Sequence, residues 1–214
     1  MKSDIIKYRD NLFDIKKRTE VIVEHLTDVR NEKYLITEVE FLCLQFRKIL
    51  ELIALSSLVA NKEEYSKQHE KFAKHYNARL IFQDLERVNP DFYPVPTRQN
   101  LKKVDGQRIF DLQHVTDGYL TKDDFLSIYE KCGGMLHAEN PYGQRRDIQA
   151  IKDEFPIWMN KIIVLLNHHN IKLVDGETMI IALMQGEGDN NPQVTEFKVL
   201  RGQEELNIRS KMQK

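Results

Sequence analysis

Cysteine is scarce in this sequence, and its scarcity excludes two classes of protein. The 214-residue chain contains only Cys43 and Cys132, which are too few for a disulfide scaffold or a multi-cysteine zinc site. The chain also lacks any run near the roughly 20 apolar residues that a membrane span needs. Its first residues, MKSDIIKYRD, contain no apolar signal core. We therefore expect a cytoplasmic protein that makes no use of the membrane.

Net charge is also nearly absent, because 32 basic residues face 33 acidic ones and leave a formal charge of -1. A general, sequence-independent binder of nucleic acid gains its affinity by neutralising phosphates, so this balance argues against that class and leaves a local basic site open. The glycine-containing stretch GEGDNNP lacks the lysine and the following helix of a phosphate loop. His69 and His75 lie six positions apart rather than the four that would place two ligands on one helical face. We expect neither a metal nor a cofactor.

What the sequence does contain is helical periodicity. Apolar residues spaced alternately by three and four predict a first helix over about residues 4–27. Thr37 followed by Glu40 forms a capping-box pattern for a second helix, which alternatively begins a turn earlier, after Asn31. This second helix is apolar around nearly its whole circumference, which is typical of a helix buried among others. Residues 63–88 predict a third helix.

The middle of the chain has weaker patterns. Three prolines within NPDFYPVP end the third helix. From there to about Leu120 no strong period appears, although LKKVDGQRIF has the pattern of a small hairpin about Asp105 and Gly106. Thr121 with Asp124 forms another capping pattern, which predicts a helix that carries the segment YEKCGGMLHA.

The last third of the chain changes character. A helical pattern covers about residues 144–169, where Pro156 must either kink the helix or lie in the first turn of another. The stretches KLV, TMIIALMQ and QVTEFKVL predict two or three short antiparallel strands. We therefore predict a mainly α fold, a bundle of four or five long helices over residues 1–170 with a small antiparallel β meander over 171–200. Residues 201–214 form a polar tail.

Two adjacent glycines, Gly133 and Gly134, precede His137 on a predicted helix. Glycine in a helix interior costs roughly 1 kcal/mol relative to alanine, so the pair indicates a close approach of another chain segment or a helix end. One interpretation is structural: His137 ends a helix, and the glycines admit a packed neighbour. The other is catalytic, because an imidazole moves protons near neutral pH and the cation of Lys131 stabilises charge on phosphorus.

The long helical bundle with its FRKILELIAL segment, followed by a later helix that ends in LHAENPY, resembles the HEPN superfamily of helical nucleic-acid-associated domains. In that family an arginine followed after four to six residues by a histidine forms a metal-independent ribonuclease site, usually assembled across a homodimer. His137 matches the family histidine, and Lys131 stands where the arginine would be. Cys132 replaces the polar residue that usually follows that arginine. The motif is thus degenerate, since lysine lacks the two-pronged guanidinium contact to phosphate.

The resemblance implies attack of an RNA 2′-hydroxyl on its neighbouring phosphate, with His137 as proton carrier and Lys131 as electrostatic stabiliser. It assigns Arg145 and Arg146 to the RNA backbone and Asn140 to a phosphate or to the loop. The structural alternatives are an ordinary turn at Asn140 and a solvated arginine pair.

The function expected from this resemblance is an RNA-associated protein of a defence or stress system, either an endoribonuclease or a non-cleaving regulator that binds RNA. The alternative is a protein-interaction scaffold without a nucleic-acid role, or one that binds a peptide along QVTEFKVL by strand addition. We assign His168 and His169 a structural role at a helix C-terminus, where a cation complements exposed carbonyls.

Overall fold

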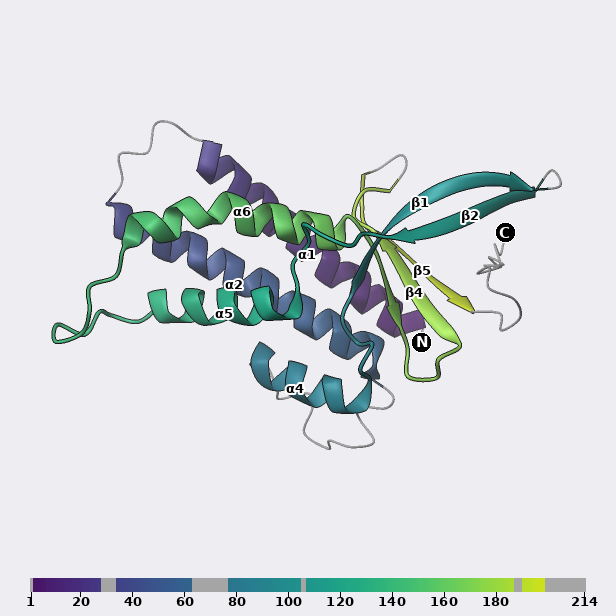
Figure 1. The fold of residues 1–214 in the computed structure, drawn as a ribbon, viewed down its shortest axis with the longest axis horizontal. Coiled ribbons are helices and arrows are strands. Elements are labelled where there is room, and N and C mark those ends of the chain that lie inside the picture. Colours follow the sequence, from purple (N-terminus) through teal and green to yellow (C-terminus); the bar gives the residue numbers. More distant parts are fainter. Residues whose placement is uncertain (1, 28–33, 63–76, 105–106, 187–189, 199–214) are drawn as a thin grey trace.

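The computed structural model describes residues 2–27, 34–62, 77–104, 107–186 and 190–198. Its helices and strands are, in chain order, α1 (Lys2–Thr27), α2 (Leu35–Ala60), α4 (Ala78–Val88), β1 (Val95–Val104), β2 (Gln107–His114), α5 (Lys122–Met135), α6 (Ile148–Leu166), β3 (His168–Lys172), β4 (Thr178–Leu183) and β5 (Gln193–Lys198). The helices gather in one part of the molecule and the strands in another (Figure 1). A mainly α fold with an antiparallel sheet is thereby confirmed.

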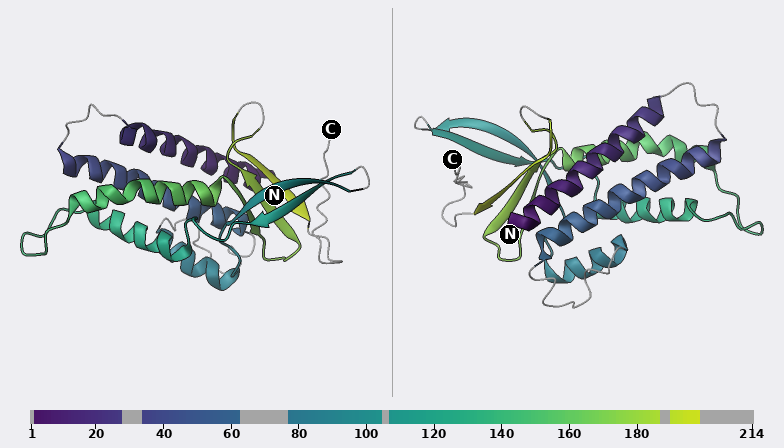
Figure 2. Two further views of the ribbon diagram at one scale, coloured as in Figure 1. Left: turned by 45° about the horizontal axis from the view of Figure 1, so that its top comes forward. Right: turned by 180° about the vertical axis from the view of Figure 1, so that it is seen from behind.

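Helix α2 lies at the centre of the helical part, as its apolar circumference predicted. Helices α1, α4, α5 and α6 all pack against it, which the two further views also show (Figure 2). Helices α1 and α2 have 26 residues each and α6 has 19, whereas α5 has 14 and α4 has 11. The prediction of four or five long helices therefore fits only in part.

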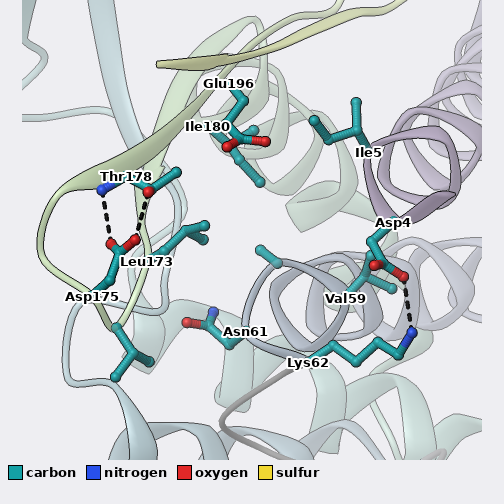
Figure 3. Close-up of a pocket in the computed structure, with 12 residues that line it drawn as sticks. Asp4, Ile5, Val59, Asn61, Lys62, Leu173, Asp175, Thr178, Ile180 and Glu196 are labelled. Carbon is teal, nitrogen blue, oxygen red and sulfur yellow. Dashed lines mark hydrogen bonds and ion pairs between the residues drawn. The ribbon is translucent and has the colours of Figure 1, made fainter. Parts of the chain in front are cut away.

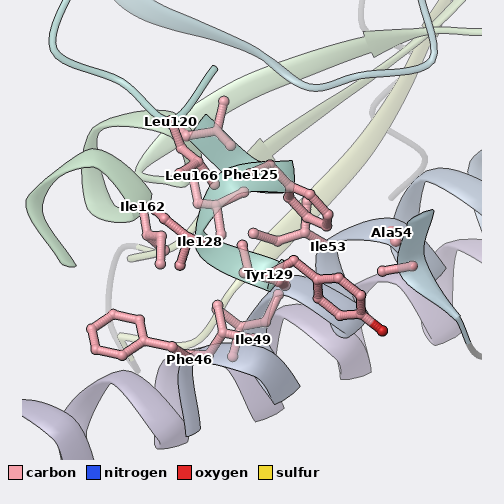
Figure 4. Close-up of a cluster of buried hydrophobic side chains, with 14 of the residues drawn as sticks. Phe46, Ile49, Ile53, Ala54, Leu120, Phe125, Ile128, Tyr129, Ile162 and Leu166 are labelled. Atoms are coloured by element: carbon pink, nitrogen blue, oxygen red, sulfur yellow. The ribbon is translucent and has the colours of Figure 1, made fainter. Parts of the chain in front are cut away.

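Aromatic side chains fill the space between α2 and the helices around it. The Phe46 ring stacks on Phe155 at a centroid distance of 5.3 Å and meets Trp158 edge-on at 5.5 Å. Figure 4 shows Phe125 and Ile128 of α5 directed into this same core, near Ile49 of α2. Burial of each large apolar side chain contributes about 1.5–3 kcal/mol, so this layer fixes the positions of α5 and α6.

Of the two predicted capping boxes, one is confirmed and one is wrong. Thr121 caps α5, because its hydroxyl accepts the backbone N–H of Asp124 while the Asp124 carboxylate accepts the Thr121 N–H. Helix α2 instead begins at Leu35, so Thr37 already lies within its first turn. There its hydroxyl donates to the Tyr34 carbonyl at 2.8 Å. A threonine inside the first turn satisfies itself this way and caps nothing.

The sheet is larger than the predicted meander. Its five strands are antiparallel and lie in the order β2-β1-β3-β4-β5. The predicted hairpin about residues 105–106 is present as β1 and β2, and it joins the C-terminal strands because Val95 and Pro96 pair with Asn170 and His169. The small meander over 171–200 was therefore too narrow a prediction. The pairing links segments more than 70 residues apart, which local sequence patterns do not reveal.

The boundary between helix and sheet lies earlier than predicted. Helix α6 is one continuous helix with Pro156 inside it, and it ends at Leu166 rather than at 169. Strand β3 starts at His168, so it spans the boundary expected between residues 170 and 171. The polar tail over 201–214 and the first part of the predicted third helix, residues 63–76, lie outside the described residues.

Candidate nucleic-acid interface

The loop between α5 and α6, residues 136–147, projects from the end of the molecule opposite the β1–β2 hairpin (Figures 1 and 2). Its tip is a tight turn. The Gly143 N–H donates to the Asn140 carbonyl at 2.9 Å, and the Tyr142 N–H donates to the Asn140 side-chain oxygen at 3.0 Å. Asn140 therefore holds the shape of the turn, and its side-chain oxygen is already engaged.

Most residues of this loop are exposed to solvent, and three of them carry side chains suited to binding a ligand. His137 and Arg145 are exposed, and Tyr142 is 97% exposed. Arg146 is half-buried and ties the loop together, because its guanidinium Nη1 donates to the His137 carbonyl at 2.9 Å. The cation that contacts His137 is thus the guanidinium of Arg146, which bonds its main chain, whereas the sequence predicted Lys131 as the cation that acts together with His137.

The two acidic residues of the loop are both bonded to backbone amides. The Glu139 carboxylate accepts the Arg146 N–H at 2.7 Å, and the Asp147 carboxylate caps α6 through the Ala150 N–H at 3.0 Å. Within the described part of the chain, Arg145 makes no ion pair. Its guanidinium therefore keeps its five N–H donors for a ligand.

Lys131 lies on α5 and is turned toward α6. Its ammonium contacts both carboxylate oxygens of Glu154, at 2.8 and 2.6 Å, and lies 5.8 Å from the centre of the Trp158 ring. The Trp158 indole N–H donates to the same carboxylate at 3.0 Å. Among the described contacts none joins Lys131 to His137, which lies beyond the end of the helix. The charge of Lys131 is matched by Glu154.

The Gly133–Gly134 pair has a structural explanation at its first position. A Cβ at Gly133 would lie 2.7 Å from Arg47 Nη1, whereas one at Gly134 would have nothing within 4 Å. Arg47 reaches this point from α2: its Nη2 donates to the Tyr129 hydroxyl at 2.6 Å, and its guanidinium carbon lies 3.9 Å from the centre of that ring. Its Nε also forms an ion pair with Glu51, at 3.2 Å. Gly133 therefore admits a guanidinium between α2 and α5.

Cys132, the residue after Lys131, faces the core rather than the loop. Both Cys132 and Cys43 are completely buried. A hydrogen bond with the Cys43 thiol, together with burial, raises the pKa of the Cys132 thiol. This thiol therefore stays protonated and adds no donor to the loop.

The prediction that His168 and His169 act as cations at a helix C-terminus is wrong. Both lie in β3 and are buried. The His169 Nδ1 hydrogen bonds the Leu166 carbonyl at 2.9 Å, so its Nε2 accepts the Tyr8 hydroxyl at 2.7 Å. Burial lowers the pKa of His169 to about 4. The ring is therefore neutral at physiological pH.

A second polar region borders a cavity of about 130 Å³ between the start of α1, the end of α2 and the β3–β4 turn (Figure 3). Lys62 contacts the Asp4 carboxylate at 3.1 Å. Asp175 accepts the Thr178 N–H at 2.7 Å, and hydrogen bonds of this kind lower the pKa of Asp175 against the opposing effect of burial. The Lys62–Asp4 contact joins the end of α2 to the start of α1, and the Asp175 contacts hold the β3–β4 turn, so these polar groups already have partners within the protein.

Helical patterns and the family motif pointed to His137, Asn140, Arg145 and Arg146 but not to Tyr142. The signal was present in PYGQRR, where an aromatic residue follows a proline in a turn that no apolar neighbour flanks. An aromatic residue in such a turn has no helical face on which to be buried.

No protein-family model, curated protein or solved structure matches this chain. Within the described ranges, no helix is long and apolar enough to span a membrane. Nor do those residues include a group of three or more histidine, cysteine, aspartate or glutamate side chains that could hold a metal ion.

Proposed function

We propose that this protein is an HEPN-like RNA-associated protein that binds single-stranded RNA through the loop over residues 136–147. The observation that carries the proposal is the joint exposure of an aromatic ring, an imidazole and an arginine on one short loop: Tyr142, His137 and Arg145. The resemblance to the HEPN superfamily alone supports the further parts, namely a homodimer and a role in defence or stress.

The exposed aromatic ring supports recognition of unpaired bases. A tyrosine that is 97% exposed contributes almost nothing to the core, whereas stacking of a base on such a ring is worth about 1–3 kcal/mol. Bases in duplex RNA are already stacked and cannot reach it, so the loop suits single strands, bulges or ends.

The arginines support contact with the backbone. A guanidinium forms paired hydrogen bonds to phosphate oxygens, and Arg145 has every donor available among its described surroundings. Arg146 uses one donor for the His137 carbonyl, and among the described contacts its other guanidinium donors have no partner. With two phosphates neutralised, the affinity should fall with salt with a slope of about -1.4 on logarithmic axes.

Binding is better supported than cleavage. The predicted pair of a cation and an imidazole needs a positive charge beside His137, but Glu154 matches the charge of Lys131. Cleavage would instead have to use Arg146, whose guanidinium contacts the His137 carbonyl. We therefore propose a regulator that binds RNA without cutting it. If the protein does cut RNA, Arg146 and His137 are the residues that would form the nuclease site, and the experiment below distinguishes the two functions.

The test incubates the purified protein and a His137→Ala variant with mixed RNA in a metal chelator, followed by electrophoresis under native and denaturing conditions. We expect the parent to retard RNA without shortening it, and the variant to do the same with modestly weaker binding. Shortened RNA from the parent but not from the variant would establish the nuclease instead. Absence of any retardation at low salt would refute the RNA-associated function.

A further inference from the structure

An open groove of about 460 Å³ runs between α1 and α6 on the surface of the helical part. Both helices pack on α2, and between them a strip of surface is left without a covering helix among the described residues. The groove is lined by Ile15, Lys16, Thr19, Glu20, Val23 and Glu24 of α1, by Ile162, Ile163 and Leu166 of α6, and by residues close to the sheet.

The floor of the groove is apolar, and each wall carries an exposed apolar side chain. Ile15, Ile162 and Leu166 form the buried floor. Val23 on one wall and Ile163 on the other are 42% and 44% exposed. At the sheet end, the Lys16 ammonium donates to the carbonyls of Met184 and Asn190, which fastens the connection between β4 and β5 to α1 and closes that end.

The groove has the form that a helix fits. Helix α1 presents two parallel rows with four-residue spacing to the groove. One row contains Ile15 of the floor with Thr19 and Val23, and the other contains Lys16, Glu20 and Glu24. Such rows are the ridges that an added helix packs between. Residues 15–24 span about 14 Å at 1.5 Å per residue, which matches two to three turns of a partner helix.

The charge of the walls defines the partner further. Glu20 and Glu24 lie along the α1 wall, and Glu20 forms an ion pair with Lys17, at 2.9 Å. Glu24 makes no ion pair with any residue that the structure describes. The α6 wall, formed by Ile163 and Asn167, carries no charge. Lys16 of the same row directs its ammonium to the carbonyls at the sheet end. Along the rest of the groove, a partner helix would meet carboxylates on one flank and uncharged side chains on the other.

We propose that this groove binds an amphipathic helix of a protein partner, with an apolar stripe on the groove floor and lysine or arginine on the flank that faces α1. The inference stands independently of RNA binding, because the loop over residues 136–147 contributes nothing to the groove. It gives the protein a surface on which another protein can be recruited.

The test uses a fluorescently labelled 14-residue model peptide of leucine and lysine arranged with helical periodicity. Two controls are its leucine and glutamate counterpart and a scrambled peptide of the same composition as the first. Fluorescence anisotropy is measured against the parent protein at low and at physiological salt. We expect saturable binding of the patterned leucine–lysine peptide, at least tenfold tighter than that of either control.

Substitutions locate the binding. Val23→Asn and Ile163→Asn should each weaken the patterned peptide about tenfold, and Glu24→Lys should weaken it at low salt more than at high salt. Ile157→Asn is the matched control, because Ile157 is an exposed isoleucine of α6, 58% exposed, that does not line the groove. Each changed side chain is exposed by more than a third, and circular dichroism checks that folding is retained.

Several outcomes would overturn the inference. The inference is wrong if the scrambled or the glutamate peptide binds as tightly as the patterned leucine–lysine peptide. It is also wrong if Ile157→Asn weakens binding as much as the groove variants do, or if Val23→Asn and Ile163→Asn both bind the peptide as tightly as the parent. Concentration-dependent self-association of the parent that Val23→Asn abolishes would assign the groove to a second copy of this chain instead.

Discussion

Two histidine sites of this protein follow the C-terminal ends of helices, and the structure gives them opposite environments. His137 follows α5 and is exposed in a loop, whereas His169 follows α6 and is completely buried. The difference lies in what the chain does next. After His137 it turns through Asn140 into solvent; after Leu166 it enters β3 at once and pairs with β4. The place of a histidine after a helix therefore does not decide its role.

The imidazole of His169 has hydrogen-bond partners within the protein, whereas the imidazole of His137 is exposed to solvent. The Tyr8 hydroxyl and the Leu166 carbonyl occupy both ring nitrogens of His169. The only described hydrogen bond of a loop residue to His137 goes to its carbonyl, from Arg146. A buried, satisfied imidazole stabilises the fold, and an exposed one remains able to meet a ligand.

The largest expected difference between these sites is their effect on stability at acid pH. Because burial lowers the pKa of His169 to about 4, the unfolded chain takes up this proton first, near pH 6.5. Stability is therefore retained above pH 6.5 and lost as the pH falls toward 4, by about 3 kcal/mol in all from this residue. Urea denaturation at pH 7, 6 and 5 measures the loss.

Two variants separate the contributions to this pH dependence. His137→Ala should keep the pH dependence of the parent, whereas His169→Gln should flatten it. His168, whose pKa is also lowered by burial, maintains a residual slope of the same sign. A parent protein that is equally stable at pH 7 and pH 5 would contradict the buried neutral imidazole.

Removal of the Tyr8 hydroxyl should give the next largest effect. Tyr8→Phe leaves the buried Nε2 of His169 without a donor, and an unsatisfied buried polar atom costs about 1–3 kcal/mol. Tyr142→Phe, the matched change on the loop, should alter the free energy of unfolding by less than about 0.5 kcal/mol. Thermal denaturation of the three proteins provides the comparison, and equal midpoints would count against the Tyr8–His169 bond.

The glycine pair before His137 offers a third comparison. Gly134→Ala should stabilise the protein by up to about 1 kcal/mol, because alanine favours the helix and the new methyl group has free space. Gly133→Ala should lose this gain, since its methyl group would displace the Arg47 guanidinium from Tyr129. Chemical denaturation of both variants tests the difference. If both substitutions stabilise equally, Gly133 is not needed for the approach of Arg47.

The smallest expected effect concerns the charge of the exposed loop. Glu139→Gln removes a negative charge near the arginines and keeps the oxygen that accepts the Arg146 N–H. We expect affinity for single-stranded RNA to rise about threefold at low salt, which corresponds to roughly 0.6 kcal/mol, and to return toward that of the parent at high salt. Unchanged affinity at every salt concentration would place RNA away from Glu139.

Local sequence patterns were sufficient for much of the helical part. The Thr121–Asp124 capping box and the buried central helix both depend on residues within a few positions of one another. The sheet required more, since β1 meets β3 across more than 70 residues, and the pairing that buries His169 is decided there. The periodicity of a single helix could not predict this strand pairing.

The sequence singled out His137, Asn140, Arg145 and Arg146 of the loop, but neither Tyr142 nor the contacts that these residues make. The sequence predicted that Lys131 and His137, six positions apart, act together at one site. In the structure the helix ends at Met135, and Lys131 forms an ion pair with Glu154 of another helix, α6. Arg146 reaches the His137 carbonyl because the loop folds back on itself, which depends on the turn at Asn140.

The most direct measurement of the central claim is the anisotropy of a labelled 12-residue single-stranded oligouridine titrated with four proteins. These are the parent, Tyr142→Ala, Arg145→Ala, and a control with Phe13→Ala, a partly exposed aromatic residue of α1. We expect saturable binding by the parent and by Phe13→Ala, with at least a fivefold loss of affinity in each of the two loop variants. Loop variants that bind as well as the parent would contradict it.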